Sequence, residues 1–534
     1  MTSVQALQRP HHAFQAAPAL AAPTPEHVSP GRALLGVLMP VLGSLLLTLD
    51  LQMTNAALTQ VIQGELAFTP DEATWISIAY VSAELIAIPL AGWLGQVFSH
   101  RWYLTVNAAL FVGCSLACAM SWDLSSLMVF RSVLGFVAGG FTALAFTRVL
   151  THLPRAKQHI GFVMTSITTG LPVSIGPLVA GWLVNDYQWQ YIYYLNVPLG
   201  LLVMAGLWHW IDPQPMQLPR LKQIDWLGTA VMAVSMMSLV TVLERGNTEN
   251  WFDSEFIVRL SITSVLLLTL FCWIELQSSK PLINLRLLRE RTFALANVFN
   301  LAVGLVLAYS FVVTQYLGQV QGYNALQIGR LLLWGSIVNP TIPKLIEHVE
   351  TRLLLGIAVS IFVVSCFINI TLTSDVAAHE LFWSQFVRAL GQPMMIAILA
   401  FIATDNIKKQ QADSASAIFN TIRTLASTIG TATLGTLLTK REQFHSNRLV
   451  ESVSMFNHQT QARLQELSQM FTGKLGDPQA AQSQAVSMLR QTVRQQAYVM
   501  AFSDCFYFIG MGILLSGIVI LFFKKIRKPG ESVS

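Results

Sequence analysis

Charge is what this chain has least of. Only 11% of its 534 residues are charged, against roughly 25% in an ordinary soluble domain, whereas 53% are hydrophobic. This composition argues against the three or four soluble domains that length alone would suggest, and indicates one integral membrane unit. The net charge of +5 is spread over short loops rather than gathered on one face, so nucleic acid is not expected as a partner.

Cysteine is also scarce, and the sequence lacks the usual signatures of enzymes. There are five cysteines, an odd number, and all lie in apolar segments, so no disulfide framework is predicted. No phosphate-binding loop, metal-ligand cluster or nucleophile–base pairing is recognisable. We therefore predict neither an enzyme nor a bound cofactor. Residues 1–32 have no apolar core, so they are interpreted as a cytoplasmic tail rather than a cleaved signal.

Long apolar runs are abundant. A membrane-spanning helix needs about twenty mostly apolar residues, and fourteen segments meet this requirement. The least regular is the tenth, which Pro340 and Pro343 interrupt. The predicted spans are residues 35–58, 73–95, 102–120, 124–148, 159–184, 190–211, 225–244, 255–276, 293–318, 326–346, 352–373, 380–404, 412–438 and 498–523.

The loops between these segments predict an orientation. Lys and Arg collect in alternate connections and in the C-terminal tail, while the other short loops carry almost none except Arg245. Because basic residues accumulate on the cytoplasmic side, both termini are expected to be cytoplasmic, in a bacterial inner membrane.

The sequence also repeats itself. Residues 175–183 and 429–437 share an Ile-Gly-x4-Gly-x-Leu pattern, 254 residues apart, and Pro89 has a counterpart in Pro340. Chance similarity between glycine-containing helices is an alternative. We predict an all-α membrane fold with a six-helix half at 33–211, a linker with two inserted helices at 212–292, a second half at 293–524 and a cytoplasmic tail at 525–534.

One long exterior connection, residues 440–496, interrupts the second half. Its apolar residues follow helical spacing on both sides of Gly476-Asp477-Pro478, which predicts an amphipathic helical hairpin. The hairpin either docks on another protein or packs against its own membrane domain.

Three charges stand out inside the apolar segments of the first half: Asp50, Glu84 and Arg131. A charge at the bilayer centre costs about 2.5–3.5 kcal/mol on insertion scales, so such groups face a bundle interior or a water path. A carboxylic acid in low dielectric holds its proton more tightly than in water and can exchange it near physiological pH. Asp50 and Glu84 are therefore candidate proton sites, with Arg131 tuning them. A structural ion pair or a helix cap is the alternative.

Other polar residues in the apolar segments are less specific. Arg388 and Arg423 either contact substrate or stabilise the second half, and Asn55, Tyr80 and Asn420 are further candidates for either role. The fifth segment holds a stripe of glycines and prolines, which permits close helix contact and bends the axis. We interpret this stripe as a tight but movable seam, and its members are Gly170, Pro172, Gly176, Pro177 and Gly181.

These motifs resemble the major facilitator superfamily, in its fourteen-helix drug:proton antiporter branch typified by EmrB and QacA. The resemblance covers nearly the whole chain. The residues that carry it are Leu49-Asp50 with Thr54-Asn55 in segment one, Trp75 to Gly92 in segment two, the glycine–proline seam of segment five, Trp189 to Gly200 with Asn196 and Pro198 in segment six, and Asn420-Thr421-Ile422-Arg423 in segment thirteen.

One motif departs from the branch. Its loop between the second and third helices usually carries an acid where this chain has Gln96, so the charge clamp of the inward-closed state is expected to be weakened or absent. The resemblance also implies a periplasmic helical loop and a membrane-fusion adaptor similar to EmrA, working with an outer-membrane channel. A pump that works alone is the alternative.

Together, the residues and the resemblance predict proton-coupled efflux of hydrophobic or amphiphilic compounds, with the proton as coupling ion and membrane lipid as surroundings. A dedicated exporter of a siderophore, lipid or fatty acid is an alternative within the same class. A receptor or scaffold that uses a transporter fold and moves nothing is an alternative from another class.

Overall fold

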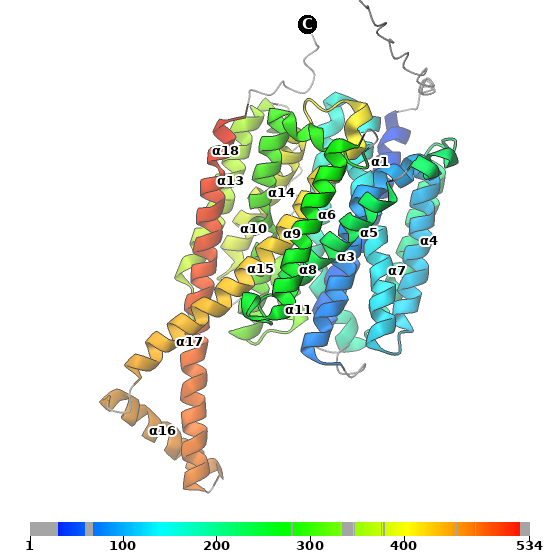
Figure 1. The fold of residues 1–534 in the computed structure, drawn as a ribbon. Coiled ribbons are helices and arrows are strands. Elements are labelled where there is room, and N and C mark those ends of the chain that lie inside the picture. The colour runs from blue at the N-terminus through cyan, green and yellow to red at the C-terminus, as the bar shows by residue number, and fades with distance from the viewer. Residues whose placement is uncertain are drawn as a thin grey trace, which may run out of the picture.

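The structure is a computed structural model that describes residues 30–58, 68–223, 225–278, 281–333, 345–346, 348–374, 376, 380–453, 457–475 and 477–523. Most of both predicted tails and most of the predicted tenth segment, with Pro340 and Pro343, lie outside these ranges. The described residues form helices and contain no strand. Figure 1 shows a bundle of long helices from which one part projects at the lower end.

The N-terminal half consists of six long helices. They are α1 (Pro30–Ala57), α3 (Pro70–Phe98), α4 (His100–Ala119), α5 (Leu124–His152), α6 (Gln158–Asp186) and α7 (Tyr191–Trp210). Two of their starts are fixed by capping boxes, Thr69 with Glu72 before α3 and Asp123 with Ser126 before α5. Such caps satisfy the free N–H groups that begin every helix.

An inserted pair follows, and then the C-terminal half. The pair is α8 (Trp226–Arg245) and α9 (Glu255–Gln277). The second half contains α10 (Arg291–Gln319), α11 (Ala325–Leu332), α13 (Thr351–Ile368), α14 (Phe382–Ala403), α15 (Ala412–Ser452), α16 (His458–Leu475), α17 (Pro478–Ser516) and α18 (Ile518–Leu521). Short 3-10 helices occupy Arg155–Lys157, Leu218–Gln223, Trp251–Asp253, Leu285–Arg289, Asn369–Thr371 and Lys409–Gln411.

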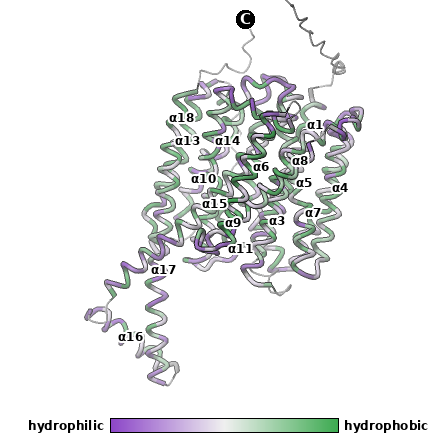
Figure 2. Tube along the Cα trace, in the orientation of Figure 1, coloured by the Kyte–Doolittle hydropathy of each residue, from purple (hydrophilic) through white to green (hydrophobic). Residues whose placement is uncertain are grey.

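Twelve helices in the described residues are long and apolar enough to cross a membrane, and the apolar band of the bundle is visible in Figure 2. They coincide with twelve of the fourteen predicted spans, which makes the chain a multi-pass membrane protein. The predicted thirteenth span lies on α15, which is absent from the twelve. Its run of Ser and Thr, with Asn420 and Arg423, makes it too polar, yet it packs against α10, α17, α3 and α5.

The two halves repeat the same helix pairs. α1 packs on α6 as α10 packs on α15, and α4 packs on α7 as α13 packs on α17. The predicted sequence repeat falls on these pairs. A Cβ at Gly176 would lie 2.5 Å from the Gln52 Cβ on α1, and a Cβ at Gly430 would lie 2.5 Å from the Gly304 carbonyl oxygen on α10. Equivalent glycines therefore permit equivalent close approaches in both halves.

The predicted hairpin projects from the bundle, and its residues are on the whole more hydrophilic than those of the apolar band (Figures 1 and 2). The helices run through the predicted boundaries 440 and 496, because α15 continues to Ser452 and α17 runs from Pro478 into the bundle without a break. A polar stretch ends a membrane span but need not end a helix. The hairpin's small core contains Leu464, Leu467 and Ala485.

A charged cluster ties α15 to α17 at the base of this projection. The Asp504 carboxylate accepts hydrogen bonds from Arg441 Nε at 2.6 Å and lies 2.7 Å from His445 Nε2. Farther out, Arg494 lies 3.4 Å from Glu442. The two long helices therefore leave the bundle as a joined pair.

Candidate functional site

A polar cavity lies between the two halves. Its volume is about 190 Å³, and its walls come from α1, α3, α5 and α6 on one side and from α10, α14 and α15 on the other. Hydroxyl groups dominate the lining, with two charged residues, Glu84 and Arg423. The other lining residues are Ser44, Thr48, Leu51, Gln52, Tyr80, Val81, Thr142, Thr168, Thr169, Val173, Leu307, Gln392, Thr424, Ser427 and Thr428.

Glu84 faces this cavity from the middle of α3. Its side chain is half-buried and makes no ion pair among the described residues, although it interacts electrostatically with Arg423 on the opposite half. Arg423 itself is only 8% exposed. An acid of the first half and a cation of the second thus line the same cavity, so movement of one half changes the charge environment of the other.

Asp50 is placed differently. It is fully buried inside the N-terminal half, where Arg131 Nη1 donates to Asp50 Oδ2 at 2.5 Å and Asn196 Nδ2 donates to Asp50 Oδ1 at 2.7 Å. The predicted pairing of Asp50 with Arg131 is therefore present in the structure. Neither residue is among those that line the cavity.

Tyr80 connects this buried pair to the cavity. Its ring lies under the Arg131 guanidinium, 4.6 Å from the ring centre to Cζ, and its hydroxyl donates to the Leu47 carbonyl oxygen at 3.2 Å. Tyr80 also lines the cavity, one helical turn from Glu84. A shift of α3 that moves Glu84 therefore also moves the aromatic surface on which Arg131 rests.

In the second half, Arg388 is buried among neutral groups. It donates to Gln385 Oε1 at 3.0 Å and to Gln392 Oε1 at 2.6 Å, and its Cζ lies 5.5 Å from the centre of the Tyr309 ring. Gln392 lines the cavity, so Arg388 is connected to the cavity wall through its hydrogen bond to Gln392. It forms no salt bridge within the described part of the chain.

Two other predicted residues lie away from the cavity wall. Asn420 is fully buried, and its side chain donates to the Ser416 carbonyl oxygen at 2.9 Å. This hydrogen bond lies within α15 and links two of its turns. Asn55 is exposed near the end of α1 and accepts from the Ser77 hydroxyl at 3.3 Å. Neither is among the side chains that line the cavity.

The glycine–proline seam meets both halves. α6 remains one helix through Pro172 and Pro177, and Gly176 faces α1. A Cβ at Gly181 would come within 2.5 Å of the Leu326 backbone nitrogen on α11, and a Cβ at Gly329 would come within 2.3 Å of the Leu178 nitrogen. Around Gly170 nothing lies within 4 Å of an added Cβ. The close contact between halves is therefore made by Gly181.

We expect Gly181→Ala to hold α6 and α11 apart, because the added methyl would meet backbone. Overpacking of this kind costs about 1–3 kcal/mol, which corresponds to a shift of about 5- to 150-fold between closed and open states. To measure this shift, Thr428 is replaced by cysteine in a protein otherwise free of cysteine, and an impermeant maleimide is added on the hairpin side. The Gly181→Ala variant should be labelled faster than the parent.

The matched control is Gly113→Ala on α4, where an added Cβ meets nothing within 4 Å. This variant should label at the parent rate. Equal labelling of the Gly181→Ala and parent proteins would contradict the role of this contact in closing the hairpin side.

At the other end of the bundle, Gln96 makes polar contacts at the position where the family motif usually has an acid. Gln96 Nε2 donates to Asp413 Oδ2 at 2.5 Å across the two halves, and Arg220 donates to Gln96 Oε1. A second contact between halves joins Arg155 to Asp405 at 2.6 Å. A polar clamp is thus present, but its acid belongs to the second half.

Sequence reasoning missed Asp413 and the cavity hydroxyls. Asp413 lies in the first turn of α15, where an acid is usually explained by the helix dipole. The hydroxyls were detectable as Ser and Thr spaced one turn apart inside apolar helices, such as Ser44 with Thr48.

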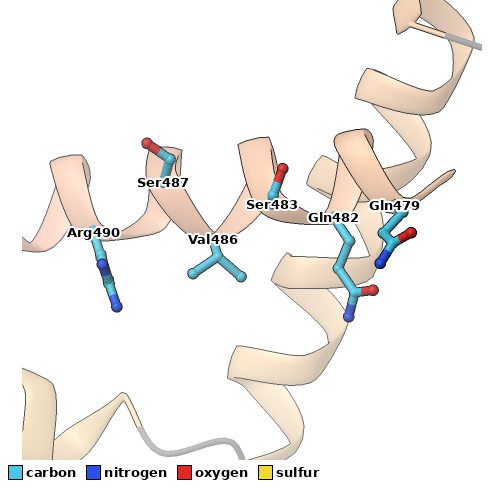
Figure 3. A pocket seen from close by; sticks show the side chains of 6 residues that line it. All are labelled: Gln479, Gln482, Ser483, Val486, Ser487 and Arg490. Atoms are coloured by element: carbon cyan, nitrogen blue, oxygen red, sulfur yellow. The ribbon is translucent and has the colours of Figure 1, made fainter. Parts of the chain in front are cut away.

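A separate hollow of about 430 Å³ lies on the projecting hairpin, lined by residues of α17 alone. Figure 3 shows these side chains along one helix: Gln479, Gln482, Ser483, Val486, Ser487 and Arg490. It is remote from the charges of the bundle, so it is not part of the central site.

A bundle of membrane-length helices with a polar, charged cavity between two similar halves defines a membrane transporter of small solutes. The family comparison agrees with this class. The model of the Major Facilitator Superfamily matches residues 41–431, and the chain belongs to this family.

Among its relatives is the multidrug export protein EmrB of Escherichia coli K12, which is 28% identical over 91% of this chain and 94% of its own length. The fatty acid resistance protein FarB of Neisseria gonorrhoeae is 25% identical over 86% of this chain and 89% of its own length. Among solved structures, the human organic anion transporter MFSD10 matches 90% of this chain and 99% of its own, with a TM-score of 0.52 and 11% identity. That similarity shows the fold alone.

Proposed function

We propose that this protein exports hydrophobic or amphiphilic compounds across the bacterial inner membrane, driven by protons that move inward. The observation that carries the proposal is the position of Glu84 in the cavity between the halves, opposite Arg423. The names of the EmrB and FarB relatives support export of hydrophobic compounds. One charge that crosses 100 mV supplies about 2.3 kcal/mol, before any pH gradient is added.

In this proposal, the two halves, residues 33–211 and 293–524, rock about the central cavity. The inserted helices of residues 212–292 lie against both halves. α8 packs on α3 and on α15, and Trp251 donates to the Thr436 hydroxyl at 3.0 Å. Glu84 is the principal proton site, because it faces the cavity. Asp50 and Arg131 form a buried pair that holds the first half together and, through Tyr80, responds to the position of α3.

The partners follow the orientation predicted by the loops. With both termini cytoplasmic, the hairpin of α15, α16 and α17 extends into the periplasm. We propose that it meets a membrane-fusion adaptor similar to EmrA, which continues to an outer-membrane channel. The projection of the hairpin from the bundle supports this partner over packing on the membrane domain (Figure 1).

The test is transport by the purified full chain in proteoliposomes that hold it inside-out. An acid lumen should drive uptake of a fluorescent amphiphilic dye, and nigericin should abolish this uptake because it collapses the pH gradient. Oleate is tested in parallel, since the similarity to FarB favours fatty acid as a second substrate class.

Uptake of oleate without dye would favour the dedicated exporter. If the pH gradient drives uptake of neither compound, nor of other amphiphiles, the export proposal is wrong and a receptor or scaffold becomes the better account.

A further inference from the structure

The contact between Gln96 and Asp413 joins three parts of the chain. Gln96 ends α3 in the first half, Asp413 begins α15 in the second, and Arg220 belongs to the linker. The Gln96 amide uses both of its ends, since Nε2 donates to Asp413 and Oε1 accepts from Arg220. A residue with one donating and one accepting end is required here, because its neighbours carry opposite charges.

The backbone is shaped for this contact. A Cβ at Gly92, one turn before Gln96, would lie only 2.7 Å from the Asp413 Cβ, so α3 and α15 approach closely where they meet. Nearby, the Ser416 hydroxyl donates to the Ala143 carbonyl oxygen at 2.6 Å and attaches α15 to α5. Asp413 therefore lies where the two halves touch, in the first turn of α15. α15 runs from there to the projecting hairpin at its other end (Figure 1).

The carboxylate of Asp413 has only neutral donors. Oδ2 accepts from Gln96, and the Thr147 hydroxyl of α5 also interacts with the carboxylate. Because no cation is paired with Asp413 in the described part of the chain, its negative charge remains at the seam between α3 and α15. A second carboxylate at position 96 would face it at close range, and like charges at such a separation repel.

We propose that Asp413 is the carboxylate that closes the inner gate, and that it acts from the second half because position 96 of the first half is a glutamine. Arg220 orients Gln96, and the pair latches α3 to α15 in the state closed to the cytoplasm. The inference deepens the proposed export cycle and rests on it. Asp413 is a positioning residue, since it holds the gate and is not among the residues of the cavity wall.

An acid at position 96, which is common in the family motif, should weaken the inner gate in this protein. In Gln96→Asp, two carboxylates face each other and the inner gate should open. In the double variant Gln96→Asp with Asp413→Asn, the acid and the amide exchange sides, Arg220 has an acid to bind, and the gate should close again. Recovery by the second substitution shows that the two side chains act through each other, and the gate readout, compared with thermal unfolding, separates this role from a purely structural one.

The measurement is gate opening rather than transport. A cysteine replaces Thr142 in the cavity wall, the five native cysteines are replaced by alanine, and an impermeant maleimide is added to inside-out vesicles. We expect Gln96→Asp to label at least about tenfold faster than the parent, as about 1.4 kcal/mol of repulsion would produce. The double variant should return to within about twofold of the parent rate. The control is Gln214→Glu, which adds the same charge at an exposed position of the linker that contains Arg220.

Parent-like labelling of Gln96→Asp would overturn the proposal, and so would a double variant that labels as fast as the single one. Thermal unfolding of each detergent-solubilised variant separates gate opening from misfolding. Because labelling needs no proton gradient, failure of the export proposal appears instead as absent pH-driven uptake in the parent. The two ideas therefore fail in different experiments.

Discussion

Glu84→Gln should abolish uphill transport while leaving a folded protein that still exchanges substrate. The amide has nearly the size of the carboxylic acid but cannot bind or release a proton, so a pH gradient has nothing to act on. Glu84 makes no ion pair among the described residues, so its neutralisation breaks no salt bridge, and Arg423 loses only a longer-range attraction. Substrate uptake driven by an acid lumen should fall to that of protein-free liposomes, whereas exchange of labelled for unlabelled substrate at equal pH should continue.

Two further variants make this result specific. Glu84→Asp keeps the carboxylate on a shorter side chain, so reduced but pH-dependent uptake is expected. Glu244→Gln removes another carboxylate of a membrane helix, on α8 and outside the residues that line the cavity, and should transport as the parent does. Undiminished uphill uptake by Glu84→Gln would remove this residue from the coupling mechanism.

Asp50→Asn and Arg131→Gln should each reduce stability sharply, whereas the double variant should recover most of it. Both side chains are fully buried and directly paired. Removal of one partner leaves an uncompensated charge in a low-dielectric interior, which costs about 3–5 kcal/mol, while replacement of both is often close to neutral. The measurement is the thermal unfolding midpoint of the four proteins in the same detergent.

The recovery is the informative part of that experiment. Strong non-additivity identifies a pair whose members act together, and the double variant can then be tested for transport. If the single variants and the double variant are destabilised additively, the two side chains contribute independently and the pair is not the element that holds the first half together.

The sequence was most informative where a residue conflicted with its local surroundings. Asp50, Glu84 and Arg131 stand out because ionised groups are costly inside apolar segments, and the structure pairs two of them and places the third in the cavity. Which of the two acids would face the cavity depends on helix rotation, and apolar segments with little amphipathic character do not reveal it. The choice of Glu84 over Asp50 therefore required the structure.

Contacts between distant parts of the chain were the least predictable. Gln96 and Asp413 are 317 residues apart, and each has an ordinary local explanation, as a loop residue and as an acid at a helix start. The departure of Gln96 from its family motif indicated that something had changed at this place. The compensation by an acid on the other half is a property of the packed interface, which single segments do not contain.

The central claim is that Glu84 gives up a proton when substrate enters the cavity. It is tested most directly with purified protein in a weakly buffered solution that contains a pH indicator dye. Substrate addition should release protons from the parent protein and none from Glu84→Gln, while tryptophan fluorescence shows that the variant still binds. Equal proton release from both proteins would contradict the account.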